Sequence, residues 1–140
     1  MEKLVAVKHM EVRFSEVDSM RIVWHGNYVK YFEDAREAFG EKYGFGYRDM
    51  VANGFYAPVV KMELEYKSPL AFGDEFDVEV RYSPCEAAKL IFEYTIRKSA
   101  TGEVSVTGSS TQVFIDTDFK LLLYCPPFVE RWRKERGVEM

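Results

Sequence analysis

The chain has 140 residues, enough for one domain with a buried core, and 47% of them are hydrophobic. Its formal net charge of −4 leaves no basic surplus to neutralise a phosphate backbone, which argues against a nucleic-acid-binding protein. Two cysteines and two histidines provide neither a disulfide framework nor a metal-ligand spacing, so we expect reduced thiols and no metal site.

The N-terminal residues contain no long apolar core and no small-residue cleavage site, and no window is long and apolar enough to span a membrane. No internal repeat, low-complexity tract or linker divides the chain. We therefore expect a cytoplasmic protein without a signal peptide or a membrane span, folded as a single domain over residues 1–140.

A strand-like run ends near residue 14 and is followed by a loop and then by a long helix. The helix is predicted over about residues 27–43, because its apolar residues recur at spacings of three and four: Tyr28, Tyr31, Phe32, Ala35, Ala38 and Phe39. Asn27 is a candidate cap at its start, and Gly44 is a candidate left-handed cap at its end.

The apolar pattern then changes to a period of two, which is typical of half-buried antiparallel strands. It predicts strands over about residues 55–67, 76–82, 90–97, 104–115 and 119–124, followed by a short helix over 128–136. Segment 44–54 is either irregular or a short second helix. One helix can bury such a sheet only if the sheet wraps around it, so we expect an α+β fold with about six antiparallel strands around one long central helix.

The loop before the helix carries the residues best suited to chemistry. Asp18, Trp24 and His25 precede a helix N-terminus, where backbone N–H groups lack intrahelical partners and the dipole favours negative charge. A carboxylate and an imidazole in this position suit chemistry at a carbonyl group. A loop aspartate more commonly caps a turn, however, and His25 could be a plain helix residue, a substrate-orienting side chain or a backbone N–H donor.

The spacing of these residues resembles that of a known family. The pattern Asp18-x6-His25-x2-Tyr28-x4-Glu33-x2-Arg36 is similar to the signature of the hotdog-fold acyl-CoA thioesterases, in particular the 4-hydroxybenzoyl-CoA thioesterase-like family. Segment 66–74 resembles a second landmark of that family, and the likeness extends over about residues 8–125. The chain departs from the family pattern at Glu16, where an Asp is typical, at Arg21, where a Gly is common, and at Phe14, where some members have a Tyr.

The resemblance implies hydrolysis of an acyl-CoA thioester. Asp18 would attack the thioester carbonyl or deprotonate a water that does so, and the sequence does not choose between the two. A backbone amide of His25 or Gly26 would polarise the thioester oxygen, and Gly26 would let the substrate approach the backbone closely. Coenzyme A is then part of the substrate, and no other cofactor is implied.

Four further residues are candidates for substrate binding: Trp24, Asn27, Tyr28 and Glu33. Three of them also have an ordinary structural interpretation, with Asn27 as a helix cap, Tyr28 as a core residue and Glu33 as one half of a surface pair with Arg36. The basic cluster at 131–136 is either a solvated helix face or a clamp for coenzyme A phosphates. Aromatic residues near the loop permit an aromatic or medium-length acyl group.

The resemblance also implies assembly, because protomers of this family pair edge to edge with active sites between them. We therefore expect a homodimer or a dimer of dimers. Three alternatives remain open at this point: a thioesterase for acyl groups on a carrier protein, a dehydratase that pairs His25 with Glu33, and a non-catalytic acyl-CoA-binding protein. The departures at Phe14 and Arg21 keep the last of these open.

Overall fold

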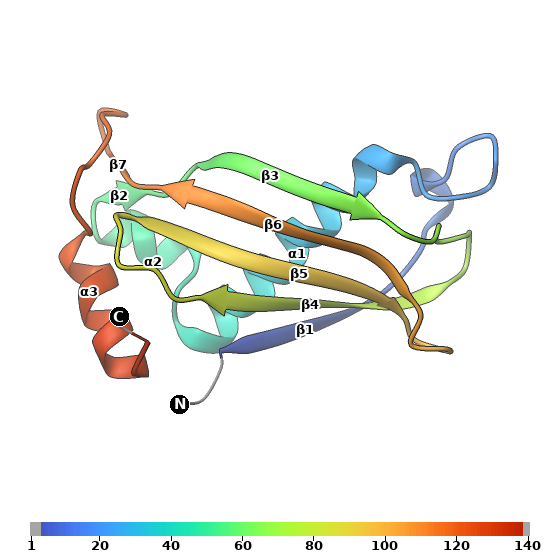
Figure 1. Cartoon of the computed structure of the whole chain (residues 1–140). Helices are drawn as coiled ribbons and strands as arrows, with labels where there is room; N and C mark the ends of the chain where they lie inside the picture. The colour runs from blue at the N-terminus through green and yellow to red at the C-terminus, as the bar shows by residue number, and fades with distance from the viewer. Residues whose placement is uncertain (1–3, 139–140) are drawn as a thin grey trace.

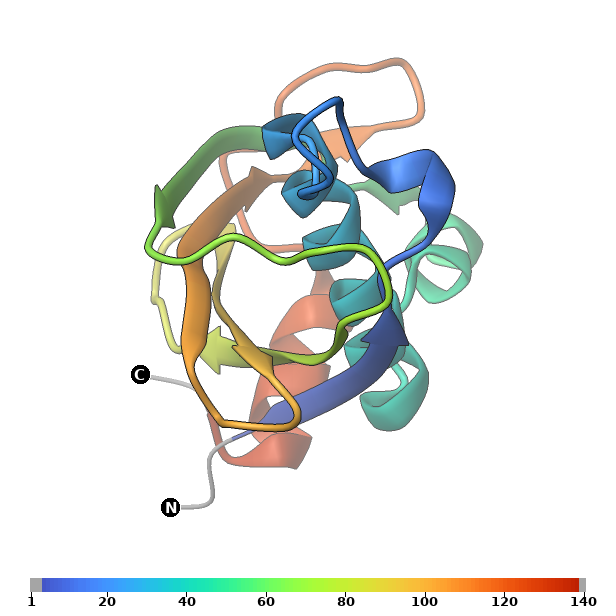
Figure 2. The same ribbon diagram turned by 90° about the vertical axis from the view of Figure 1, so that its right-hand side faces the viewer.

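The computed structural model describes residues 4–138 and contains one long helix inside a curved antiparallel sheet. The helix is α1 (Tyr28–Tyr43). The sheet has the order β1-β4-β5-β6-β3, with strands β1 (Val5–Glu11), β4 (Glu75–Ser83), β5 (Lys89–Lys98), β6 (Val104–Val113) and β3 (Val59–Tyr66). Figure 2 shows the sheet curving around α1. The expected α+β architecture of a sheet wrapped around one long helix is confirmed.

The inner face of α1 packs directly against the concave side of the sheet. Tyr31, Phe32, Ala35 and Phe39 recur at helical spacing and are all buried. The Phe32 ring stacks on Tyr94 of β5 with ring centroids 4.3 Å apart. The helix ends at Gly44, whose φ of 65° is the left-handed cap that the sequence predicts.

A glycine of β6 allows this close packing of helix on sheet. A Cβ atom at Gly108 would lie 2.6 Å from the Phe32 ring and 2.5 Å from the Glu63 carbonyl oxygen. Any side chain at this position would therefore push the helix or the neighbouring strand away.

Strands β3 and β4 share the alternating sequence pattern but not its burial. In β4 the apolar residues Phe76, Val78 and Val80 face α1 and are fully buried. In β3, at the edge of the sheet, Val60 is 60% exposed and Tyr66 is 54% exposed. The sequence pattern alone predicts a half-buried strand in both cases, whereas β3 leaves much of its apolar surface open.

The two ends of the sheet carry different elements, as Figure 1 shows. Loop 12–27 lies at one end. At the other end lie α2 (Tyr47–Ala52), α3 (Pro127–Arg136) and the short pair β2 (Phe55–Tyr56) and β7 (Ile115–Asp116). Trp132 of α3 stacks on Phe45 with centroids 4.0 Å apart and donates its indole N–H to the Tyr43 carbonyl, which closes the core at this end.

Two predicted strands differ from the structure. The single strand expected over 55–67 is interrupted at Ala57 and Pro58, which separate β2 from β3. The strand expected over 119–124 does not form, because the Asp116 carboxylate accepts hydrogen bonds from the backbone N–H groups of Asp118 and Lys120 and folds the chain into a turn.

The basic cluster on the last helix is partly structural. Arg133 is buried and donates to the Tyr82 hydroxyl at 2.8 Å and to the Lys89 carbonyl at 2.7 Å. Its guanidinium is therefore used to hold α3 against the sheet, which removes it from the proposed phosphate clamp. No helix within residues 4–138 is long and apolar enough to cross a membrane.

Candidate active site at the start of the central helix

Loop 12–27 is a small hairpin tied to the start of α1. Val17 pairs with Val23 in an antiparallel bridge, and Trp24 N–H donates to the Glu16 carbonyl at 2.9 Å. The Asn27 side-chain amide donates to the same carbonyl at 2.8 Å. These bonds hold the loop in one conformation directly above the N-terminus of the helix.

Asp18 lies at the tip of this hairpin. Its carbonyl accepts from Arg21 N–H at 2.9 Å, which closes a four-residue turn, and its Oδ1 accepts from Met20 N–H at 2.8 Å. The ordinary interpretation of Asp18 as a turn residue is therefore correct for one carboxylate oxygen. The other oxygen has no hydrogen-bond partner among residues 4–138, and the residue is partly exposed.

The turn explains one departure from the family pattern. Arg21 has a φ of 65°, in the left-handed region where glycine has no steric penalty and other residues do. A glycine at this position would adopt the same conformation without that penalty. Arg21 therefore keeps the geometry of the loop and bears a conformational cost of about 1 kcal/mol.

The helix begins with a short 3₁₀ turn, η2 (His25–Asn27). The first backbone hydrogen bond of this turn is donated by Asn27 N–H to the Trp24 carbonyl at 2.9 Å. The N–H groups of His25 and Gly26 precede it and have no acceptor within the described part of the chain. Two adjacent unpaired donors at a helix N-terminus are suited to an oxyanion.

His25 is held through its backbone rather than through its ring. The Tyr66 hydroxyl at the end of β3 donates to the His25 carbonyl at 3.2 Å. The imidazole is exposed, lies 5.0 Å from the Trp24 ring centroid and makes no hydrogen bond to residues 4–138. This arrangement favours the backbone interpretation of His25 over the imidazole one.

Gly26 packs against the Trp24 ring. A Cβ atom at position 26 would overlap this ring, which lies against the helix start. The half-exposed indole fills the space that glycine leaves, and the close approach of a substrate to the backbone at Gly26 stays a prediction.

The remaining predicted binding residues are placed as follows. The Asn27 side chain makes no capping hydrogen bond to the helix, and its amide donates to the backbone carbonyl of Glu16. Tyr28 is buried and its hydroxyl accepts from Leu70 N–H at 3.2 Å, so it is a core residue. Glu33 is exposed and forms no ion pair with Arg36, whose guanidinium donates to the Tyr94 hydroxyl at 3.1 Å.

The sequence analysis did not identify Glu16 and Tyr66 as site residues. Glu16 is buried, and its carboxylate accepts from Arg13 N–H at 2.8 Å and from the Arg13 guanidinium at 3.3 Å. Burial, together with the nearby Glu16 charge, raises the pKa of the Tyr31 hydroxyl far above its ordinary value. Glu16 accepts from the N–H of the residue three positions earlier, as in half of a capping box, but Arg13 is not the Ser or Thr that makes this motif recognisable in a sequence.

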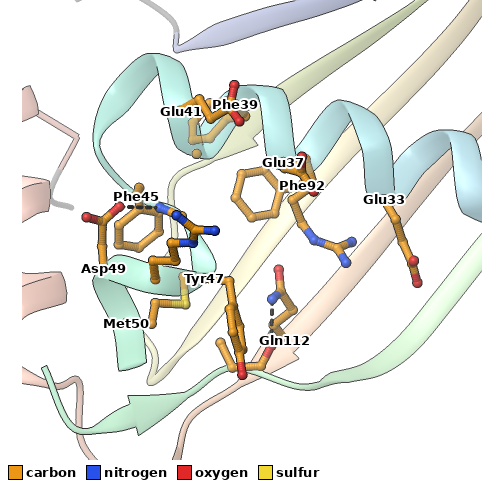
Figure 3. A pocket seen from close by; sticks show the side chains of 15 residues that line it. Glu33, Glu37, Phe39, Glu41, Phe45, Tyr47, Asp49, Met50, Phe92 and Gln112 are labelled. Atoms are coloured by element: carbon orange, nitrogen blue, oxygen red, sulfur yellow. Dashed lines mark hydrogen bonds between the residues drawn. The ribbon is translucent and has the colours of Figure 1, made fainter. Parts of the chain in front are cut away.

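A cavity lies at the opposite half of α1, between α1, α2 and the sheet. We call it the α1–α2 pocket; its volume is about 740 Å³, and Figure 3 shows its side chains. Phe39, Phe45, Met50 and Phe92 provide apolar walls. Polar lining residues include Glu33, Arg36, Glu37 and Gln112. Of these, the sequence analysis had singled out Glu33 and Arg36.

Comparison with known proteins agrees with this geometry. Residues 12–133 match the model of the thioesterase-like superfamily. The chain is 35% identical over 114 residues to YneP of Bacillus subtilis, a protein assigned to the acyl-CoA thioesterases, covering 81% of this chain and 82% of that one.

Solved structures show the same fold. A DHNA-CoA thioesterase from Staphylococcus aureus superposes with a TM-score of 0.83 and 29% identity, covering 95% of this chain and 91% of that one. A protein from Thermus thermophilus, TT1821, superposes with a TM-score of 0.82 and 27% identity, covering 93% and 98% of the two chains. The chain therefore belongs to the thioesterase-like superfamily and is a hotdog-fold thioesterase.

Proposed function

We propose that this protein hydrolyses acyl-CoA thioesters with Asp18 as the reacting carboxylate and the backbone N–H groups of His25 and Gly26 as the oxyanion site. The observation that carries the proposal is the pairing of these features on one loop. A carboxylate with a free oxygen and two unpaired N–H groups at a helix N-terminus are held together by the hydrogen bonds of residues 16–27.

Two chemical routes fit this arrangement. In one, the free Asp18 oxygen attacks the thioester carbonyl carbon, the C–S bond breaks, and water then hydrolyses the acyl-aspartyl anhydride. In the other, Asp18 takes a proton from water, which attacks the same carbon, and the coenzyme A thiolate leaves and is protonated. In both routes the negative charge develops on the carbonyl oxygen, where the helix N-terminus stabilises it.

The site is completed by a second copy of the chain. Strand β3 pairs with β6 on one side, and within the described residues no strand pairs with its other side. Its exposed apolar residues, Val60 and Tyr66 among them, would be covered if two β3 strands paired across a two-fold axis. Such a pair is antiparallel and joins the two sheets into one.

This pairing brings the two halves of the site together. The C-terminal end of β3 is tied to loop 12–27, because the Tyr66 hydroxyl donates to the His25 carbonyl. The N-terminal end of β3 borders the α1–α2 pocket. Ala57, two residues before the strand, lines this pocket, and its carbonyl accepts a hydrogen bond from Gln112. In an antiparallel pair, the loop of one protomer therefore lies beside the pocket of the other. We propose that each active site combines Asp18 of one protomer with the α1–α2 pocket of its partner.

Asp18→Asn tests the hydrolytic role. Asn has nearly the shape of Asp, so fold, assembly and affinity should be retained while the turnover number falls by at least about 10². Steady-state kinetics with short, long, branched and aromatic acyl-CoAs, read by release of free thiol, measures this effect. Asp34→Asn, an exposed carboxylate on α1, is the matched control and should turn over like the wild type. Wild-type turnover in a folded Asp18→Asn protein would contradict the mechanism.

A further inference from the structure

The two cysteines of the chain line one cavity beside α3. Cys85 belongs to the connection 84–88 between β4 and β5, and Cys125 comes two residues before α3. Both side chains line a cavity of about 470 Å³, which we call the thiol pocket, and both are partly exposed. Two thiols from segments far apart in the sequence therefore share one solvent-accessible site.

A buried guanidinium holds these two segments together. Arg133 is 5% exposed and donates to the Cys125 sulfur at 3.2 Å. It also donates to the Tyr82 hydroxyl at 2.8 Å and to the Lys89 carbonyl at 2.7 Å. Tyr82 lies near the end of β4 and Lys89 begins β5, so these two partners flank the connection that carries Cys85. Arg133 therefore binds Cys125 directly and fixes both ends of the connection that carries the other thiol.

The electrostatics of the thiol pocket agree with this proximity. Burial raises the pKa of the Cys125 thiol above its ordinary value, the Arg133 guanidinium opposes this rise, and the charge of Cys85 adds to it. Burial also raises the pKa of the Tyr82 hydroxyl, and both cysteines contribute to that rise. At neutral pH Cys125 is therefore mostly a neutral thiol, in keeping with the expectation that the cysteines are reduced at rest.

We propose that Cys85 and Cys125 form a redox-active pair that hydrogen peroxide converts into an intramolecular disulfide. One cysteine, as its thiolate, attacks a peroxide oxygen, and the O–O bond breaks. This step gives a sulfenic acid, and the hydroxide that leaves takes up the proton released by the thiol. The other sulfur then attacks the sulfenic sulfur, the S–S bond forms, and the hydroxyl leaves as water with the second thiol proton. Two thiols and one peroxide thus give one disulfide and two waters, and two electrons pass from sulfur to oxygen.

The connection 84–88 is the part of this site that can adjust to the bond. It lies outside helix and strand, and Glu86 and Ala87 next to Cys85 are exposed. A disulfide requires two Cβ atoms about 3.5–4.5 Å apart, and this connection can move toward Cys125 without breaking a strand or a helix. Arg131 and Lys134 also line the thiol pocket and provide positive charge, which favours the thiolate that attacks.

The test counts free thiols before and after oxidation. The purified full-length protein is treated with hydrogen peroxide, denatured and alkylated with iodoacetamide, and its intact mass is measured. The untreated protein should take up two alkyl groups. The oxidised protein should take up none and should be about 2 Da lighter than the unalkylated reduced chain, the mass of two hydrogen atoms. Dithiothreitol should restore both alkylation sites, and peptide mapping should place the link between Cys85 and Cys125.

Two single variants provide the controls. Cys85→Ser and Cys125→Ser each keep one thiol and change one atom of the other side chain, so neither should form the intramolecular link. Three results for the wild-type protein would overturn the proposal: uptake of two alkyl groups after oxidation, oxidation only to sulfinic or sulfonic acids, or formation only of disulfide-linked dimers. The measurement does not involve turnover, so its outcome is independent of the proposed hydrolysis.

Discussion

The two ends of α1 differ in what they contribute to the candidate site. At the N-terminal end the hydrogen-bonded loop carries Asp18 and the unpaired N–H groups of His25 and Gly26, and the Trp24 ring packs against Gly26. In the C-terminal half an open pocket of about 740 Å³ has aromatic walls and the polar groups of Arg36 and Gln112.

This difference favours the proposed site shared between two protomers. The N-terminal end carries the proposed reactive groups, and the C-terminal half of α1 lines the pocket. The strand β3 spans both ends and leaves its outer edge unpaired. In the proposed dimer, a two-fold axis beside β3 would place the loop of one protomer beside the pocket of the other.

The largest expected effect tests the backbone donors at the N-terminal end. His25→Pro removes an N–H that the helix does not use, and proline is tolerated in the first turn of a helix, so the fold should be retained. Turnover should fall by at least about 10², the usual effect of losing an oxyanion donor. His25→Ala keeps the N–H and should retain most of the activity. Steady-state kinetics on the two folded variants distinguishes a role of the His25 backbone N–H from a role of its imidazole. Near-complete loss of activity in His25→Ala would assign chemistry to the imidazole.

A subunit-mixing experiment tests whether the two ends act across the dimer. Ala57→Trp should fill the α1–α2 pocket, so its homodimer and the Asp18→Asn homodimer should both be nearly inactive. After subunit exchange about half of the dimers are mixed, and each has one intact site, so activity should return to about a quarter of the wild-type value.

Native mass spectrometry provides the control for this mixing, because it counts the mixed dimers directly. If the mixed dimers form and the mixture stays inactive, the carboxylate and the pocket act within one protomer. A protein that remains a monomer at micromolar concentration would contradict the shared site altogether.

A smaller effect concerns the rigidity of the N-terminal end. Arg21→Gly relieves the left-handed conformation at φ 65° and should raise the free energy of unfolding by about 0.5–1 kcal/mol. Turnover should change little, since the loop already has this geometry. Chemical denaturation measures the gain. Lys30→Gly in α1 is the control of opposite sign and should lose about 1 kcal/mol; a loss in both variants would show that the Arg21 conformation is not strained.

The smallest effect is expected at an exposed cluster on β1. Hydrogen bonds donated by the His9 ring to the carboxylates of Asp77 and then Glu75 raise the pKa of His9 above its ordinary value of 6.5. Protonated His9 therefore adds stability that is fully present below pH 6.5 and is lost as the pH rises through its raised pKa. His9→Gln should slightly flatten the dependence of unfolding free energy on pH in this window, with turnover unchanged. An unaltered pH dependence would show that these exposed contacts contribute nothing.

The sequence predicts the N-terminal end better than the C-terminal half. Asp18, His25 and the helix follow from local spacing, because the loop and the helix are adjacent in the chain. The strand expected at 119–124 does not form, although its apolar residues alternate. The Asp116 carboxylate accepts hydrogen bonds from the backbone N–H groups of Asp118 and Lys120, and these bonds stabilise a turn in place of a strand. Alternation reports which residues could share a face and not which hydrogen bonds form.

Gln112 shows the other limit. It lies in a strand rich in Ser and Thr, where a glutamine is unremarkable by composition. The orientation of its side-chain amide is set by one hydrogen bond to the Ala57 carbonyl, and Ala57 is 55 residues away in the chain. A contact of this kind arises from the pairing of β3 with β6, and no local spacing in the sequence encodes it.

The position of Trp24 gives the protein an internal optical reporter. The chain has two tryptophans: Trp132 is buried against Phe45 at the α3 end, whereas Trp24 is half exposed over the helix start. The Trp24 indole packs against Gly26, so an acyl-CoA bound at the start of α1 would lie beside this ring. Ligand binding at the helix start is therefore expected to change the emission of Trp24, which allows it to be followed in the unlabelled protein.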